Sequence, residues 1–335
     1  MITLDGTNGI TTPMPGTVSE HVTSPTGFKN RLINGRMRIA QRGTSATITA
    51  GTAVPTISTG YPCVDRWFVY SVGGNPTAAQ VTGAGPDQNQ LQITGAASVT
   101  QIGVGQRIEQ NNSYDLNGST CTLSVDLSNS LLTTVTWTAS YANTIDTFGT
   151  IGTPTKTQIA TGTFTVTSTL TNYNVQIAIP SAATTGIEIL FTVGAQTSGT
   201  WVIDDVQLEK SPYPTSYDYR DYGRELIMCQ RYHLMFGGNL LGTSWCLVGL
   251  FNSTSVGVLS CSLPVVLRTV PTVITYGSAL LTSATVSSTV TIMTLTGYSK
   301  HSITFTLTGT GTPYTVNHPA LAAFTNDIQL AAEIA

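Results

Sequence analysis

Apolar and polar residues alternate in short runs along most of this chain, and turn-forming residues separate the runs. Successive side chains of a β-strand point to opposite faces, so each alternating run places its apolar residues on one side of a sheet. The clearest runs are Cys121, Leu123, Val125 and Leu127; Val135, Trp137, Ala139 and Tyr141; Tyr173, Val175, Ile177 and Ile179; and Ile187, Ile189, Phe191 and Val193. They predict an antiparallel β-sandwich over residues 28–217, in which each sheet has one face in water.

The alternation gives way to helical spacing in residues 218–236. Asp221 can cap the start of a helix. Four side chains then share one stripe at spacings of three and four: Tyr222, Leu226, Cys229 and Tyr232. Gly237 and Gly238 are expected to stop it. A single short helix is not stable alone, so we expect the stripe to pack on the sandwich edge or on other copies of the chain.

Alternating runs return over residues 237–335, for example where threonines separate Ile303, Phe305 and Leu307. Residues 1–27 are rich in Gly, Pro and Thr and too polar to build a core, so they predict an extended arm. The chain is therefore expected to be all-β. Its parts are an N-terminal arm, an antiparallel sandwich, one connecting α-helix and a C-terminal domain that is also sandwich-like.

Charged residues make up 9% of the chain and the net charge is −3, whereas an average soluble domain has roughly 25% charged residues. Nucleic-acid binding is not expected, because phosphate contacts need clustered Lys and Arg. Basic residues do gather between Lys29 and Arg42. Their position at a predicted domain start favours salt bridges, with a basic nucleic-acid arm as the alternative.

No run reaches the ~18 apolar residues of a membrane helix, and the N-terminus has no cationic segment leading into an apolar run. We therefore expect a protein that is made in a cytoplasm and does not insert into membranes. The five cysteines show neither CxxC spacing nor the density of a disulfide scaffold. Free, buried thiols are expected.

Catalytic motifs are missing from the sequence. The four histidines stand in no nucleophile or metal motif, and there is no GxSxG elbow. Glycoside cleavage needs two carboxylates across one bond. Asp204 and Asp205 are adjacent in a predicted strand and should point to opposite faces. The sequence thus predicts a protein that is not an enzyme.

Asp204 is nevertheless a candidate site residue, because it shares its predicted strand face with Val202, Val206 and Leu208. A carboxylate facing inward needs a partner. The partner is expected to be an arginine, with Arg66, Arg107 and Arg42 as the candidates, or a bound calcium ion.

The C-terminal domain offers candidate contact residues. Tyr298, Lys300 and His301 lie in the turn of a predicted hairpin, and Tyr314 is an aromatic residue outside the clear alternating runs. Loops of this kind commonly make binding contacts. These four residues are therefore predicted to contact a receptor, whereas Trp67, Trp137 and Trp201 fall on strands and should pack in the core.

Several segments resemble bacteriophage fibre and other virion surface proteins that contain a jelly-roll domain like those of carbohydrate-binding modules. They are IDDVQLE at 203–209, YDYRDYGRELIMCQRYH at 217–233, LINGRMRIAQRGTS at 32–45, VDRWFVY at 64–70, GQRIEQ at 105–110 and TLSVDLS at 122–128. Together they lie within residues 28–235. Beyond residue 236 only the general plan of such proteins is similar.

The resemblance implies a jelly roll over residues 28–217, in which structural calcium is common, and a distal receptor-binding domain over residues 237–335. It implies a virion location after assembly in the host cytoplasm, with residues 1–27 attaching to tail or baseplate proteins. It also implies a homotrimer with the helix near the threefold axis. The expected function is that of a tail fibre that binds a host-surface glycan or protein. A capsid-decorating or head-fibre protein with glycan-binding modules, or a polysaccharide depolymerase, are the alternatives.

Overall fold

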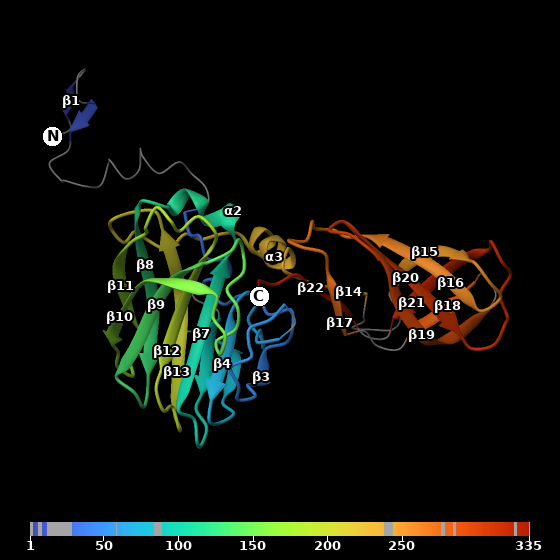
Figure 1. The fold of residues 1–335 in the computed structure, drawn as a ribbon, viewed down its shortest axis with the longest axis horizontal. Coiled ribbons are helices and arrows are strands. Elements are labelled where there is room, and N and C mark those ends of the chain that lie inside the picture. Colours follow the sequence, from blue (N-terminus) through green and yellow to red (C-terminus); the bar gives the residue numbers. More distant parts are fainter. Residues whose placement is uncertain are drawn as a thin grey trace.

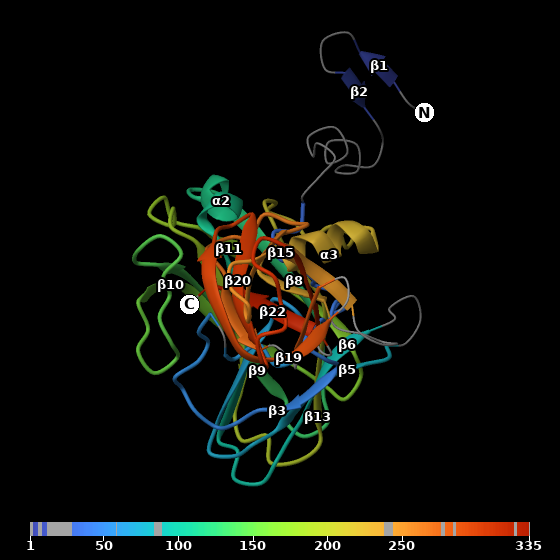
Figure 2. The same cartoon turned by 90° about the vertical axis from the view of Figure 1, so that its right-hand side faces the viewer.

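The computed structural model describes residues 3–5, 9–11, 29–57, 59–83, 89–237, 244–275, 279–283, 286–324 and 327–334. Within these residues two β domains follow one another along the longest axis of the molecule, with helix α3 (Tyr222–Gln230) between them (Figure 1). The prediction of an all-β chain is confirmed. A short hairpin, β1 (Thr3–Asp5) and β2 (Gly9–Thr11), stands apart from both domains (Figure 2). The remainder of the predicted arm at 1–27 lies outside the described residues.

The first domain is a jelly-roll sandwich of two antiparallel sheets, ordered β10-β9-β12-β7-β4 and β11-β8-β13-β6-β5-β3. Its strands are β3 (Ser45–Thr47), β4 (Phe68–Val72), β5 (Thr77–Val81), β6 (Gln90–Thr94), β7 (Gln101–Ile108), β8 (Thr120–Asn129), β9 (Thr134–Ala142), β10 (Lys156–Thr165), β11 (Thr171–Ala178), β12 (Ile187–Val193) and β13 (Thr200–Glu209). A helical turn, α2 (Gln110–Ser113) with the 3-10 helix η1 (Tyr114–Leu116), connects β7 to β8.

The alternating runs face one another across this sandwich. The apolar residues of β8 and β12 are buried in a single core that also holds Trp67, Trp137 and Trp201, as the sequence predicted. The polar positions between them face outward. One irregularity interrupts the pattern: the pairing of β13 with β8 shifts between Asp204 and Gln207.

The second domain is a closed barrel of antiparallel strands in the order β15-β16-β20-β19-β18-β21. Its strands are β15 (Ser244–Phe251), β16 (Val256–Ser262), β18 (Ala279–Thr282), β19 (Ser287–Tyr298), β20 (Ser302–Gly309) and β21 (Pro319–Phe324). Ile303, Phe305 and Leu307 point inward and threonines alternate with them on β20. The sequence predicted a sandwich-like domain here. Pairing of β15 and β18 with β21 closes the sheet on itself instead, which leaves no open edge strand in the barrel.

Helix α3 and a small sheet join the two domains. Asp221 caps the helix, as predicted, by accepting a hydrogen bond from the backbone N–H of Arg224 at 3.0 Å. The helix ends before residue 236, because the chain from His233 pairs with the C-terminal strand. The sheet has the order β14-β22-β17, with β14 at His233–Gly237, β17 at Thr272–Thr275 and β22 at Asp327–Ala331. In the described part of the chain, no helix has the length and apolar character needed to cross a membrane.

Candidate functional site

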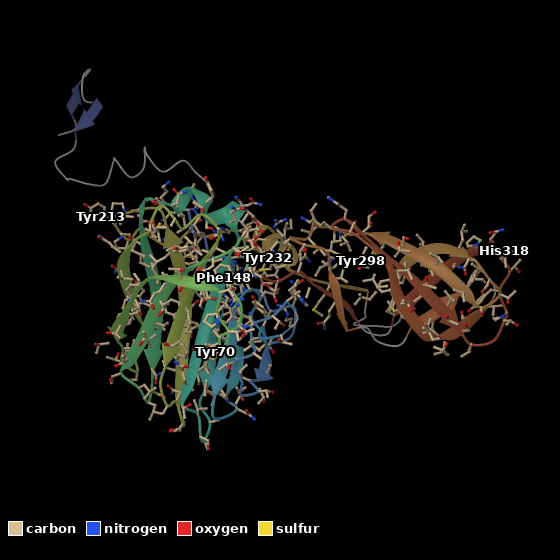
Figure 3. The ribbon with its side chains drawn as sticks, in the orientation of Figure 1. Tyr70, Phe148, Tyr213, Tyr232, Tyr298 and His318 are labelled. Atoms are coloured by element: carbon tan, nitrogen blue, oxygen red, sulfur yellow. The ribbon has the colours of Figure 1, made fainter. Side chains whose placement is uncertain are left out.

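The predicted contact turn lies at the end of the barrel that faces the first domain. Tyr298 closes β19 and is 56% exposed, and Lys300 and His301 are exposed in the turn after it. Their carbonyl groups accept hydrogen bonds from the loop after β16, with Leu267 N to Lys300 O at 3.0 Å. Figure 3 places Tyr298 near α3, far from His318 at the other end of the barrel.

Tyr314 is not a surface residue, contrary to the prediction. Its side chain is 4% exposed and stacks on Phe251 with ring centroids 4.0 Å apart and an interplanar angle of 14°. Its hydroxyl bonds the Ser288 hydroxyl at 2.6 Å and the Leu281 carbonyl group. Tyr314 follows β20, whereas Tyr298 precedes it, so the two lie toward opposite ends of that strand. The structure therefore does not bring the four predicted contact residues together.

The far end of the barrel presents two polar loops that the sequence analysis did not select. They are residues 252–255 between β15 and β16, and residues 310–318 between β20 and β21. Hydrogen bonds fasten the second loop to β15, with Phe251 N to His318 O at 3.0 Å and Asn317 N to Phe251 O at 2.7 Å. Val316 and His318 remain exposed. The turn-forming Gly, Thr, Pro and Asn residues within 309–319 are the sequence feature that could have identified the second loop.

Asp204 is buried, but on the outer face of its sheet. It lies directly opposite Asp126 in the register of β13 and β8, and the neighbours of Asp126 on β8 point into the core. The predicted face was wrong because the register shift after Asp204 changes the alternation. Val206 and Leu208 reach the core, while Asp204 does not. Asp205 has a φ of 44°, which fits this irregularity.

The environment of Asp204 favours a protonated carboxyl group. One oxygen accepts a hydrogen bond from the backbone N–H of Asp205 at 2.8 Å, and the other has no partner among the described residues. Burial raises the pKa of Asp204 to about 7, and the neighbouring charges of Asp205 and Asp126 add to this effect. Arg36 is the nearby cation, and it pairs with Asp205 at 3.2 Å.

None of the three arginines proposed from the sequence pairs with Asp204. Arg66 and Arg42 bind Glu333, and Arg107 binds Glu188. A bound calcium ion, which takes about six to eight oxygen ligands, stays a prediction. Among the described residues no three His, Cys, Asp or Glu side chains are grouped closely enough to hold a metal ion.

The apolar stripe of α3 is used inside the molecule. Cys229 and Tyr232 are buried against Ile33, Phe148 and Ile334, and Leu226 packs beside them. Tyr222 is the exception: it is 52% exposed, with the Arg38 guanidinium 5.6 Å from its ring centroid. Three of the four predicted interface residues thus form the joint between the two domains.

The C-terminal residues complete this joint by returning to the first domain. Glu333 is fully buried, and its carboxylate pairs with Arg66 and, at 3.0 Å, with Arg42. The carbonyl oxygen of Ile334 accepts hydrogen bonds from Arg107 Nη1 and Tyr61 Oη, both at 3.2 Å. The C-terminal tail therefore helps to fix the barrel to the sandwich, together with the buried stripe of α3. These contacts join residues that are far apart in the sequence, so no local motif predicted them.

Buried charges at the joint are balanced by aromatic and ionic neighbours. The Arg66 guanidinium lies 3.6 Å from the ring centroid of Tyr232 and donates to the Arg107 carbonyl group at 2.6 Å. Burial is the largest single influence on Arg66 and disfavours its charge, but Glu333, Tyr232, Tyr61 and Cys229 together outweigh burial and raise the Arg66 pKa. Burial raises the pKa of Asp65 to about 6 even though Arg42 is close to it.

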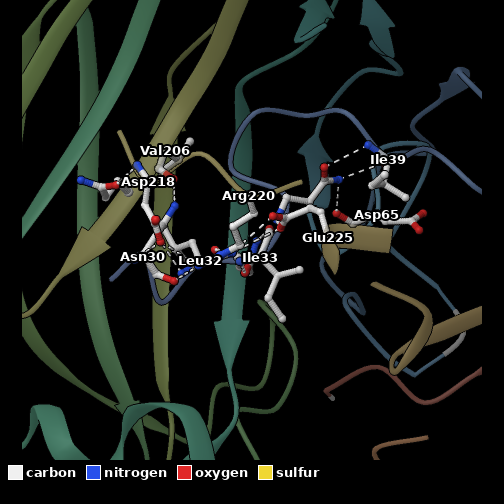
Figure 4. A network of polar contacts seen from close by, with 12 residues as sticks. Asn30, Leu32, Ile33, Ile39, Asp65, Val206, Asp218, Arg220 and Glu225 are labelled. Carbon is white, nitrogen blue, oxygen red and sulfur yellow. Dashed lines mark hydrogen bonds and ion pairs between the residues drawn. The ribbon is translucent and has the colours of Figure 1, made fainter. Parts of the chain in front are cut away.

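Two of the sequence motifs meet at a cleft on the first domain. Asn34, Arg36 and Arg38 come from the turn after residue 30. Tyr217 and Arg220 come from the segment leading into α3, and Glu225 lies on α3 itself. Figure 4 shows the network beneath it, in which Arg220 contacts Glu225 and the carbonyl group of Leu32. The backbone N–H of Asn34 donates to Glu225. The same network holds both chain segments against β13.

Gly35 allows this close approach. A Cβ at this position would lie 2.1 Å from the carbonyl oxygen of Val206 and 2.7 Å from the Tyr217 hydroxyl. Asn34 and Met37, on either side, have φ values of 58° and 53°. The turn therefore bends tightly against β13 and presents Arg36 and Arg38 toward Tyr217, Tyr219 and Tyr222.

No protein-family model matches the chain, and no curated protein matches it. Solved structures similar to it include a family 4 carbohydrate-binding module (16% identity, 53% of this chain, 98% of that chain, TM-score 0.35). A putative sugar binding protein from Bacteroides thetaiotaomicron has 14% identity over 55% of this chain and 100% of its own, with a TM-score of 0.36. The enzymatically active domain of tailspike protein 4 from bacteriophage CBA120 has 16% identity over 47% of this chain and 21% of its own, with a TM-score of 0.31. At these values the similarity assigns neither a ligand nor an activity.

Proposed function

We propose that this chain is a structural adhesion protein of a virion, a tail fibre without enzymatic activity that binds a host-surface glycan or protein. The low charge and alternating Thr-rich strands of the chain support a durable surface protein, and the ordered fibre-like motifs within residues 28–235 support the virion assignment.

The position of the loops at 252–255 and 310–318 carries the proposal. They form the end of the molecule farthest from the sandwich, with His318 at the tip (Figure 3). The barrel beneath them is fixed to the first domain through Glu333 and the buried stripe of α3. A rigid stalk that ends in polar loops is suited to surface contact, because little loop ordering is needed on binding.

The test uses the full chain, labelled and incubated with a panel of bacterial cells. We expect binding to fall at least tenfold when His318 and Val316 are both replaced by alanine. The matched control replaces Tyr298 and His301, which are exposed at the opposite end of the same barrel. Equal loss in the control, or full binding by the tip variant, would remove the distal loops from the proposal. Labelling of particles with an antibody against the barrel then distinguishes a tail fibre from a capsid protein.

The proposal includes a homotrimer. Because the α3 stripe is buried inside the molecule, the contact between copies is proposed to lie on the barrel wall. Val248 and Leu250 on β15 and Leu321 on β21 are exposed, and Val248 lies directly opposite Leu321 in the register. Neighbouring apolar side chains without charges favour contact between copies. Light scattering should give three copies for the chain and fewer for Val248→Glu. A monomeric parent chain would contradict the trimer.

A further inference from the structure

Two exposed tyrosine rings lie beside the arginines that line the cleft between the turn at 34–38 and the segment 217–225. Tyr219 is 60% exposed and Tyr222 is 52% exposed. The Arg36 guanidinium lies 4.3 Å from the ring centroid of Tyr219, and that of Arg38 lies 5.6 Å from the ring centroid of Tyr222. Each of these two residues is thus more than half exposed although a guanidinium group lies over its ring.

The arginines at this cleft differ in the hydrogen bonds and ion pairs that they form within the chain. Arg220 bonds two backbone carbonyl groups and pairs with Glu225, and Arg36 pairs with Asp205. Arg38, by contrast, forms no ion pair with any residue that the structure describes. It lines the cleft, and among the described residues its guanidinium contacts the ring of Tyr222. A planar cation of this kind is suited to bidentate binding of a carboxylate.

We propose that this cleft binds an acidic polysaccharide whose pyranose rings carry carboxylate groups. The carboxylate would pair with Arg38 inside the cleft, and the sugar rings outside it would lie on Tyr222 and Tyr219. The open space between the lining residues is small and accommodates a single polar group, not a whole ring, which fits a carboxylate held inside with its sugar outside.

Other anions fit the arrangement less well. A phosphate or an acidic peptide would use the cations, but it would leave the two tyrosine rings without contacts, whereas the faces of pyranose rings are apolar and pack on aromatic side chains. The site belongs to the sandwich domain and is separate from the distal barrel loops. It can therefore be present even if adhesion through the barrel is wrong.

The experiment measures binding of oligogalacturonate to the full chain by calorimetry, with a neutral galactan oligomer of the same length as the reference. We expect oligogalacturonate to bind and galactan to bind at least tenfold more weakly. Arg38→Gln should weaken oligogalacturonate binding by about tenfold or more, since a charge-assisted hydrogen bond is lost. Tyr222→Ala should weaken it further than Tyr222→Phe, which keeps the ring.

Arg224→Gln is the matched control, because Arg224 is an exposed arginine on α3 that forms no ion pair among the described residues and does not line the cleft. Unchanged binding in this variant supports the cleft. Equal weakening in Arg38→Gln and Arg224→Gln would show diffuse attraction of a polyanion and overturn the proposal. Tighter binding of a poly-glutamate peptide than of oligogalacturonate would overturn it in favour of an acidic protein partner. Melting temperatures of all variants within a degree or two of the parent exclude unfolding as the cause.

Discussion

The interiors of the sandwich and of the barrel contain different kinds of side chain. The sandwich and its joint enclose Asp65, Arg66, Arg107, Glu188 and Asp204, all nearly or fully buried. The barrel, within its described residues, encloses apolar side chains and the hydroxyl of Tyr314, which bonds Ser288 and the Leu281 carbonyl group. The few charges of this chain are thus concentrated where two elements must be held in a fixed relation. We expect the first region to respond to pH and to single charge deletions, and the second to respond to neither.

The largest expected effect comes from Glu333→Ala at the joint. Removing one member of a buried ion pair leaves the other charge uncompensated, which typically costs about 3–5 kcal/mol. Here Arg66 and Arg42 would both lose their shared partner. We expect lower stability in urea unfolding and a broader distribution of molecular lengths in small-angle X-ray scattering, since the ion pairs of the C-terminal tail no longer anchor the barrel.

Lys300→Gln is the control for this variant, because Lys300 is an exposed charge of the barrel without an ion pair among the described residues. Its stability should stay within about 0.5 kcal/mol of the parent. If Glu333→Ala behaved like Lys300→Gln, the tail would not be what holds the two domains together.

Asp204→Asn tests the pH dependence of the sandwich. The pKa of Asp204 is about 7 in the folded chain and 3.8 for an ordinary aspartate. Below pH 3.8 both states hold the proton and the group has no effect. As pH rises from 3.8 to about 7, the unfolded chain releases its proton first, so the folded state loses stability by an amount on the order of a few kcal/mol.

The neutral amide cannot lose a proton, so Asp204→Asn should melt higher than the parent at pH 8 and similarly at pH 4. Differential scanning calorimetry at both pH values checks this, with Asp115→Asn as the control at an exposed carboxylate. Added calcium that raises the melting temperature of the parent at pH 8, but not that of Asp204→Asn, would instead establish a metal site at Asp204.

The sequence predicted the elements better than their relations. Alternation identified β8, β9, β11 and β12, because both faces of these strands have a consistent environment. It failed at Asp204, where an irregularity shifts the register, and at Tyr314, which lies between strands where no period applies. The contacts of the joint could not be predicted for another reason. Glu333 and Arg66 are separated by most of the chain, and only the complete fold brings them together. The cleft is lined by residues of two motifs that the sequence analysis had selected, but no local sequence pattern indicated that these motifs lie side by side.

The smallest expected effect is Tyr314→Phe, which tests the barrel side of the comparison. The variant keeps the stack on Phe251 but removes the hydroxyl that bonds Ser288 and the Leu281 carbonyl group. Removing a hydrogen bond and leaving its buried partner unsatisfied lowers the free energy of unfolding by about 1–3 kcal/mol. Because this polar contact is at the edge of the barrel interior, we expect a loss of about 1 kcal/mol. The loss should be the same at pH 5 and pH 8, because no charged group takes part. Tyr298→Phe, at an exposed ring, should leave the calorimetric transition unchanged. A loss that varied with pH, or an equal loss in Tyr298→Phe, would show that the barrel does not depend on neutral internal packing in the way its contacts indicate.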